Sequence, residues 1–166
     1  MDKQFEDQLS SFVDGKVCVM GIGNRHLHDD GVGSFVAEAL ESSPGFDAID
    51  AGFIPENCLE KVASKHPDTI LMVDATDFGG EPGQVALIYP DKVAYSGVST
   101  QAGSLRMLAE YMSARTHAPV ALLAIQPGDL SEGEDLSPPV SSTFKELLET
   151  LPAICSRNRS FNRHMS

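Results

Sequence analysis

One stretch decides the fold of this chain: Val17-Cys18-Val19-Met20-Gly21-Ile22-Gly23-Asn24-Arg25-His26-Leu27-His28-Asp29-Asp30-Gly31-Val32-Gly33. It begins as an apolar, β-branched run, which predicts a buried strand. The strand breaks at Gly21 and Gly23, where the backbone can turn sharply or approach a ligand closely. A polar loop with two adjacent carboxylates follows, and apolar residues at helical spacing come next. In an open α/β sheet, this order places the loop at the carboxyl end of a strand, where such folds bind ligands.

Two kinds of ligand could occupy this loop. A dinucleotide-binding turn has the spacing G-x-G-x-x-G, but here His26 stands at the third glycine position. Asp29 and Asp30 would also repel a pyrophosphate that approached the start of the following helix. The two acids suit a cation, although a carboxylate at a helix start can simply interact with the helix dipole. We favour a cation site, because a further acid follows another strand.

The composition indicates one ordinary globular domain. The chain has 166 residues, of which 42% are hydrophobic and 22% are charged. The net charge of −12 argues against a nucleic-acid partner, because phosphate binding needs basic patches. No apolar run approaches the roughly 20 residues of a membrane span, and the first 14 residues are too acidic for a secretory signal. The three cysteines match no metal spacing, and we expect a cytoplasmic protein with free thiols.

The remaining pattern predicts strands that alternate with helices. We expect further strands at residues 46–51, 69–73, 84–89 and 119–126. Helices are expected to follow the first, second, fourth and fifth strands. The fourth strand comes too soon after the third for a helical crossover, so it should run antiparallel or lie at an edge. The result is an α/β three-layer sandwich: a mostly parallel five-stranded sheet with one antiparallel strand and helices on both faces. The expected boundaries are a polar lead-in at 1–15, one domain at 16–156 and a basic, flexible tail at 157–166.

A second acidic feature follows the third expected strand. The apolar run Thr69-Ile70-Leu71-Met72-Val73 leads directly into Asp74-Ala75-Thr76-Asp77. An Asp at this position can cap a turn. However, parallel strands end at the same edge of a sheet, so we expect Asp30 and Asp74 to approach each other across a cleft at that edge. The acidic residues between Pro127 and Pro139 are interpreted as a solvated loop.

These motifs together resemble the nickel–iron hydrogenase maturation endopeptidases, and most closely the branch that matures the formate-linked hydrogenase. The resemblance covers about residues 16 to 151. It is carried by Gly21-Ile22-Gly23-Asn24, Asp29-Asp30-Gly31-Val32-Gly33, Asp50-Ala51-Gly52, Pro55-Glu56-Asn57, Asp74-Ala75-Thr76-Asp77, Pro82-Gly83 and Ile125-Gln126-Pro127. It implies an endopeptidase that removes a C-terminal extension from the hydrogenase large-subunit precursor after nickel insertion. The nickel would be borne by the substrate and not held permanently by the enzyme.

The resemblance also implies roles for particular residues. Asp30 and Asp74 fall on the family's metal-contacting acids and would be the catalytic residues. The family's third contact, a histidine, falls on Gln101, and an amide oxygen is a poor nickel ligand. His28 could supply the missing imidazole, with His26 as the weaker candidate. We expect the substrate to contact Asn24 and Gly52.

Two functions remain open at this point. A metal between Asp30 and Asp74 could polarise a peptide carbonyl or activate water, and a free carboxylate could act as a general base. The sequence has no serine or cysteine nucleophile pattern. Our first hypothesis is therefore a nickel-sensing endopeptidase whose partner is a hydrogenase large-subunit precursor. The alternative is a module that binds the nickel-loaded precursor but cleaves it poorly or not at all, which Gln101 favours.

Overall fold

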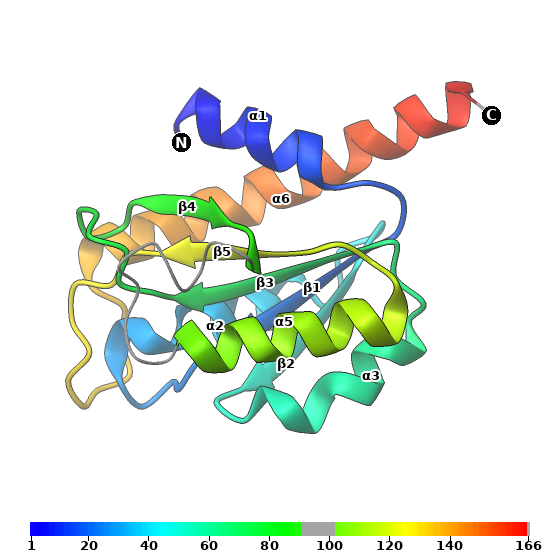
Figure 1. Cartoon of the computed structure of the whole chain (residues 1–166). Coiled ribbons are helices and arrows are strands. Elements are labelled where there is room, and N and C mark those ends of the chain that lie inside the picture. The colour runs from blue at the N-terminus through cyan, green and yellow to red at the C-terminus, as the bar shows by residue number, and fades with distance from the viewer. Residues whose placement is uncertain (91–101, 166) are drawn as a thin grey trace.

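A mixed sheet lies at the centre of the molecule (Figure 1). The structure is a computed structural model and describes residues 1–90 and 102–165, with the side chains of residues 1–90 and 105–157. Within these residues the sheet has five strands in the order β2-β1-β3-β5-β4. Four strands are parallel: β1 (Val17–Ile22), β2 (Asp47–Gly52), β3 (Thr69–Ala75) and β5 (Val120–Ile125). The edge strand β4 (Val85–Ile88) pairs antiparallel with β5, as its short connection predicts.

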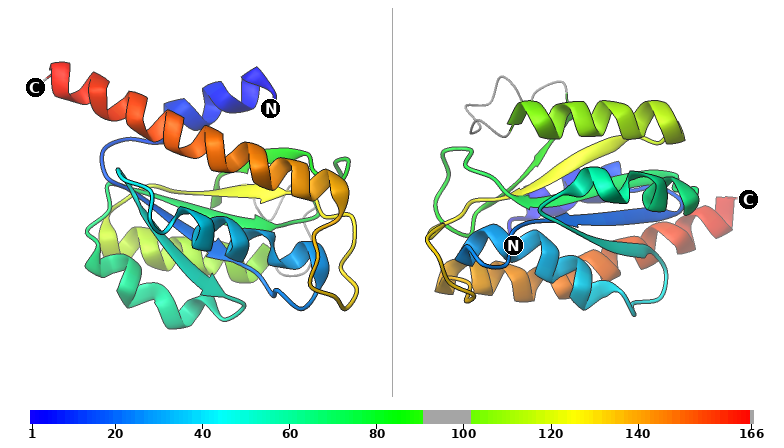
Figure 2. Two further views of the ribbon diagram at one scale, coloured as in Figure 1. Left: turned by 180° about the vertical axis from the view of Figure 1, so that it is seen from behind. Right: turned by 90° about the horizontal axis from the view of Figure 1, so that it is seen from below.

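Helices cover both faces of the sheet (Figure 2). One face carries α1 (Lys3–Phe12), α2 (Val32–Leu40) and α6 (Pro138–Met165). The other face carries α3 (Leu59–Ser64) and α5 (Ala102–Thr116). Short 3₁₀ helices precede α2 and α3: η1 (His28–Gly31) and η2 (Pro55–Cys58). The predicted α/β sandwich is confirmed.

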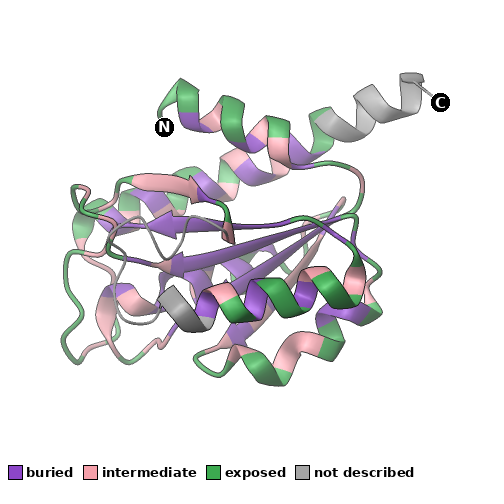
Figure 3. Ribbon diagram, viewed as in Figure 1, coloured by how far each residue is buried: buried purple, intermediate pink, exposed green. Residues whose placement is uncertain are grey.

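The central strands are buried on both sides, as their apolar runs predict (Figure 3). Successive side chains of a strand point to opposite faces, so each strand contributes to two hydrophobic clusters. The cluster under α3 and α5 contains Met20, Met72 and Leu122. The cluster under α1, α2 and α6 contains Val19 and Leu71, among others. The strands are therefore held rigidly, and their carboxyl ends are fixed in relation to one another.

Both ends of the chain are helical. Where a polar lead-in is expected, α1 buries Phe5 and Leu9, which stand one helical turn apart and share a face. At the other end, α6 continues to Met165, so the backbone of the expected tail is helical from 157 to 165. Although α6 has 28 residues, no helix in the described ranges is long and apolar enough to cross a membrane.

Helix α2 lies so close to the sheet that only glycine fits at two positions. A Cβ atom on Gly33 would overlap the carbonyl oxygens of Val73 and Ile22. A Cβ atom on Gly21 would overlap the carbonyl oxygen of Gly33. The start of α2 is therefore pressed against the ends of β1 and β3. This contact also fixes the loop that joins β1 to α2.

A methyl group at residue 33 should destabilise this packing. We expect Gly33→Ala to lower the free energy of unfolding by about 3 kcal/mol, because backbone atoms on two strands would have to move. Ser42→Ala, at an exposed position just beyond α2, should change it by less than about 0.5 kcal/mol. Urea unfolding of both variants measures the difference. Equal stability of Gly33→Ala and the unchanged chain would contradict the packing described here.

Candidate functional site

Asp30 and Asp74 lie at the carboxyl edge of two neighbouring parallel strands. Strands β1 and β3 pair from Val17 with Thr69 to Gly21 with Val73, and Asp74 is the next residue of β3. Asp30 lies in η1, which follows the loop after β1. The side chain of Asp74 is buried, and that of Asp30 is half-buried. The predicted adjacency of the two strands is therefore confirmed.

The environment of the two carboxylates disfavours negative charge. Burial raises the pKa of Asp74 well above its ordinary value, the negative charge of Asp30 adds to this, and a hydrogen bond from the Ala75 backbone opposes it. Burial also raises the pKa of Asp30, and a bond from the backbone of Asn24 offsets part of the increase. The two acids are thus close enough to interact electrostatically. A cation or a proton at this edge would relieve the repulsion between them.

The glycine loop holds Asp30 in place through its backbone. The amide nitrogen of Asn24 donates to Asp30 Oδ2 at 3.1 Å. The amide of Gly23 donates to the carbonyl oxygen of Gly52 at 2.8 Å, which ties the loop to the end of β2. Asn24 also accepts a bond from the His26 amide through Oδ1, at 3.0 Å. Asn24 and Gly52 therefore help to hold the loop that carries Asp30, and their contact with substrate stays a prediction.

Arg25 fastens the same loop to α2 and β2. Its guanidinium donates to Asp50 Oδ2 at 2.7 Å and to Ser34 Oγ at 2.8 Å. Ser34 in turn donates to Asp50 Oδ1 at 2.6 Å. Arg25 also pairs with Glu38 and lies over the ring of Phe35, 4.7 Å from its centroid. The loop that carries Asp30 is thus joined to both α2 and β2.

Asp29 has a different role from its neighbour Asp30. Its side chain is fully buried. Its Oδ2 accepts bonds from the amides of Gly128 and Asp129, both at 2.8 Å, and from the Ser137 hydroxyl at 2.7 Å. Its Oδ1 accepts a bond from the Ser137 amide at 2.7 Å. Burial alone would raise the pKa of Asp29, but these bonds outweigh it and the pKa is lowered. Asp29 is a structural anchor for the loop between β5 and α6, which the sequence indicates only as a solvated loop.

The structure does not group the histidines of the glycine loop with the two acids. His28 Nδ1 lies 2.6 Å from the carbonyl oxygen of Asp135, so the ring is engaged with the loop between β5 and α6. His26 is exposed, with its Nδ1 3.9 Å from Glu134. Gln101, which the resemblance implies as the third contact, lies outside the described residues. In the part of the chain that is described, no group of three or more His, Cys, Asp and Glu could hold a metal.

Gln126, to which sequence reasoning assigned no role, organises the loop after Asp74. This buried side chain follows the end of β5. Its Oε1 accepts bonds from the amides of Phe78 and Gly80, at 2.9 and 3.1 Å, and its Nε2 donates to Asp77 Oδ1 at 3.1 Å. The sequence feature that could have drawn attention to Gln126 is its polar side chain at the end of an apolar strand. Its partners, almost fifty positions earlier in the sequence, could not be inferred from it.

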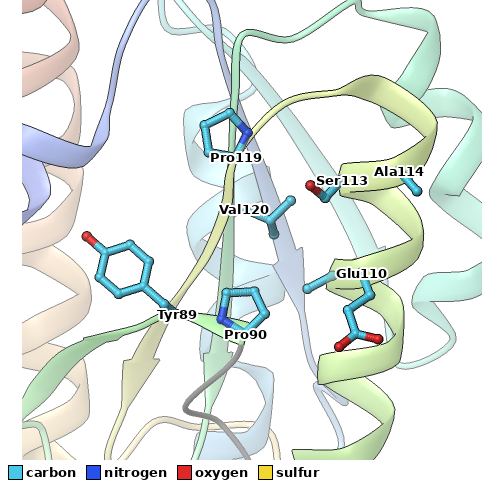
Figure 4. A pocket seen from close by; sticks show the side chains of 8 residues that line it. Tyr89, Pro90, Glu110, Ser113, Ala114, Pro119 and Val120 are labelled. Carbon is cyan, nitrogen blue, oxygen red and sulfur yellow. The ribbon is translucent and has the colours of Figure 1, made fainter.

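A separate cavity lies at the opposite end of the sheet (Figure 4). Its volume is about 610 Å³, and its lining includes Tyr89, Glu110, Ser113 and Val120. Val120 begins β5, whereas Asp74 pairs with Ala124 near the end of that strand. Four residues of strand separate these positions by about 13 Å. This cavity is therefore not part of the site at Asp30 and Asp74.

Comparisons with known proteins point to one family. Residues 34–154 match the family model HycI, hydrogenase maturation protease. The hydrogenase 3 maturation protease of Escherichia coli is 39% identical over 75 residues, which are 44% of this chain; the chain spans about half of that relative, 48%. The hydrogenase expression/formation protein HupD of Rhizobium leguminosarum is 30% identical over 81% of this chain and 71% of its own length. The crystal structure of the [NiFe] hydrogenase maturation protease HycI from Thermococcus kodakarensis superposes with a TM-score of 0.81 at 31% identity, covering 90% of this chain and 99% of that one.

Because Asp29 anchors the loop between β5 and α6, its replacement should lower the stability of the fold by an amount that depends on pH. Asp29→Asn should lower the free energy of unfolding at pH 7 by about 2 kcal/mol, because an amide cannot accept all four bonds. Since the folded-state pKa of Asp29 is lowered, its contribution is complete above the unfolded-state pKa of about 4 and is lost as the pH falls through the folded-state value. Urea unfolding should therefore show a smaller difference in the free energy of unfolding between Asp29→Asn and the unchanged chain at pH 3 than at pH 7.

The control for this experiment is Asp135→Asn, whose side chain is exposed in the same loop. It should leave stability unchanged within about 0.5 kcal/mol at both pH values. An Asp29→Asn difference of the same size at pH 3 and pH 7 would show that the charge of Asp29 does not stabilise the fold.

Proposed function

The chain belongs to the hydrogenase maturation protease family, and on this premise we propose that it is an endopeptidase acting on the large-subunit precursor of a nickel–iron hydrogenase. It removes the C-terminal extension of the precursor after nickel has been inserted. Asp30 and Asp74 contact the nickel, which belongs to the substrate and arrives with ligands of its own. The reaction takes place in the cytoplasm, which agrees with the unpaired thiols of Cys18 and Cys58.

The observation that carries this proposal is the pair of carboxylates at one edge of the sheet. Asp74 is fixed in a rigid strand, and Asp30 is held by the backbone of the glycine loop. Two carboxylate oxygens alone make a weak site for nickel, which prefers nitrogen and sulfur ligands. A pair of this kind suits recognition of a metal that other ligands already hold, because the enzyme does not then extract it.

The same two residues supply the chemistry of peptide hydrolysis. The reaction needs an activated water and a proton for the leaving amine. Before the nickel-loaded substrate binds, the raised pKa of Asp74 allows its carboxyl group to take up and release a proton closer to neutral pH than an ordinary Asp does. Asp30 is the more exposed of the two and can contact the incoming substrate directly.

Gln101 favours a second candidate function. By the resemblance, this chain has a neutral amide where the family has a histidine, and the described residues contain no group of three or more His, Cys, Asp and Glu that could hold a metal. A site with two acids and an amide could still bind the nickel-loaded precursor. The chain would then be a binding module that cleaves slowly or not at all. Release of the C-terminal peptide from a nickel-loaded precursor distinguishes the two functions.

Removal of either acid should abolish processing. We expect Asp30→Ala and Asp74→Asn each to lower the rate of precursor cleavage by at least about a hundredfold. Co-expression with candidate large-subunit precursors, followed by mass measurement of their C-termini, detects the product. Glu132→Gln, in an exposed part of the loop between β5 and α6, is the control and should process normally. Normal processing by both Asp variants would overturn the proposal.

A change at residue 101 tests the third contact. Gln101→His should tighten the binding of nickel or cadmium to the purified protein, because an imidazole nitrogen replaces an amide oxygen. Metal titration of the unchanged chain, of Gln101→His and of His28→Ala measures this. Weaker binding in His28→Ala, without a gain in Gln101→His, would place the third ligand at His28. No change in either variant would show that neither residue contacts the metal.

A further inference from the structure

Exposed apolar side chains gather on one side of the molecule. In the described part of the chain, six large apolar residues are exposed, and four of them come from the loop after β2 and from α5. They are Phe53, Ile54, Met107 and Tyr111, with exposed fractions of 64, 48, 72 and 49%. Single exposed apolar residues are ordinary, but a concentration of this kind marks a surface that binds something.

The two helices of this face border a groove. Helices α3 and α5 lie side by side over the same face of the sheet (Figure 1). Between η2, α3 and α5 is a hollow of about 270 Å³, lined by Leu59, Met107, Leu108, Tyr111 and Glu56. Four of these five side chains have large apolar surfaces. We call this hollow the α3–α5 groove.

The single acid in the groove has no partner among the described residues. Two nearby glutamates on α3 and α5 are already paired: Glu60 with Arg115 at 3.1 Å, and Glu110 with Arg106 at 3.0 Å. Glu56 is exposed and makes no such ion pair in the described structure. A carboxylate beside an apolar groove favours an apolar ligand that also carries a positive charge.

A short stretch of chain connects the site at the sheet edge with the groove. Gly52 ends β2 there, where its carbonyl oxygen accepts the bond from Gly23. Phe53 and Ile54 follow Gly52 directly and lead into η2, which carries Glu56. Asp74 follows Met72 by two positions in β3, so both side chains point to the face that α3 and α5 cover. A polypeptide bound at Asp74 can therefore extend along this face into the groove.

We propose that the α3–α5 groove docks an apolar segment of the protein substrate that carries a lysine or arginine, and that this basic residue pairs with Glu56. The inference rests on the proposed function, because it takes the occupant to be the same precursor that reaches Asp30 and Asp74. A second copy of this chain is a poorer occupant, since two molecules of net charge −12 repel each other. The groove would supply affinity for the precursor at a distance from the cleaved bond.

The test measures docking and cleavage separately. Binding of a purified, nickel-loaded large-subunit precursor gives a Kd, and release of its C-terminal peptide gives kcat and KM. Met107→Asp places a charge in the groove, and Glu56→Lys reverses its charge. Both residues are exposed, so the variants should fold normally. We expect each to raise Kd and KM about tenfold and to leave kcat within about twofold of the unchanged value.

Two control variants introduce the same residues, Asp and Lys, on α6, which covers the opposite face of the sheet. Ser142→Asp and Glu149→Lys are at exposed positions and should leave Kd and KM unchanged. A charge exchange provides the sharpest result: one Lys→Glu or Arg→Glu change in the precursor should weaken binding to the unchanged chain and restore it to Glu56→Lys. Unchanged Kd in both groove variants would overturn the docking proposal.

The two proposals fail in different ways. If the unchanged chain binds the precursor and never cleaves it, the proposed endopeptidase activity is wrong, and the Kd values of the groove variants still decide the docking proposal. If the unchanged chain cleaves the precursor with a KM that Met107→Asp and Glu56→Lys do not alter, the endopeptidase stands and the groove is not its docking surface.

Discussion

The close contact between α2 and the sheet is the constraint on which the candidate site depends. Gly21 and Gly33 let the start of the helix lie against the backbone of β1 and β3, where no larger residue fits. The loop between β1 and α2 is then too short to lie anywhere except over the ends of these two strands. Asp30 is carried to that edge, and Asp74 is already there as the next residue of β3 after the pair formed by Gly21 and Val73. Backbone packing therefore sets the distance between the two acids.

Two adjacent aspartates divide the tasks of folding and function. Asp29 accepts hydrogen bonds from Gly128, Asp129 and Ser137, and thereby fixes a long loop at the same edge of the sheet. Asp30 accepts one backbone bond and keeps the rest of its carboxylate available. Asp74 is buried near that charge, an arrangement that costs stability in the free protein. Carboxylates whose pKa values are shifted in this way are concentrated at functional sites.

The surface beyond these carboxylates agrees with a protein substrate. Exposed apolar side chains extend from the loop after β2 to α5. The proposed recognition of a metal in the substrate would need most of its affinity from contacts with the polypeptide. The combination of a sparse acidic site and a larger apolar face fits that requirement, and the separate cavity at the start of β5 lies too far from Asp74 to contribute.

The local sequence by itself determined the alternation of strands and helices, the antiparallel edge strand, and the positions of Asp30 and Asp74 at the carboxyl edge of the sheet. These features depend on apolar periodicity, on glycine and proline, and on the common direction of parallel strands, all of which short stretches of sequence carry. Only the tertiary structure decided that Asp29 is an anchor, that His28 faces the loop between β5 and α6, and that Gln126 braces the loop after Asp74. The partners of these side chains lie about 50 to 110 positions away in the sequence. Hydrogen bonds over such separations leave no local pattern, because the fold alone brings the two ends together.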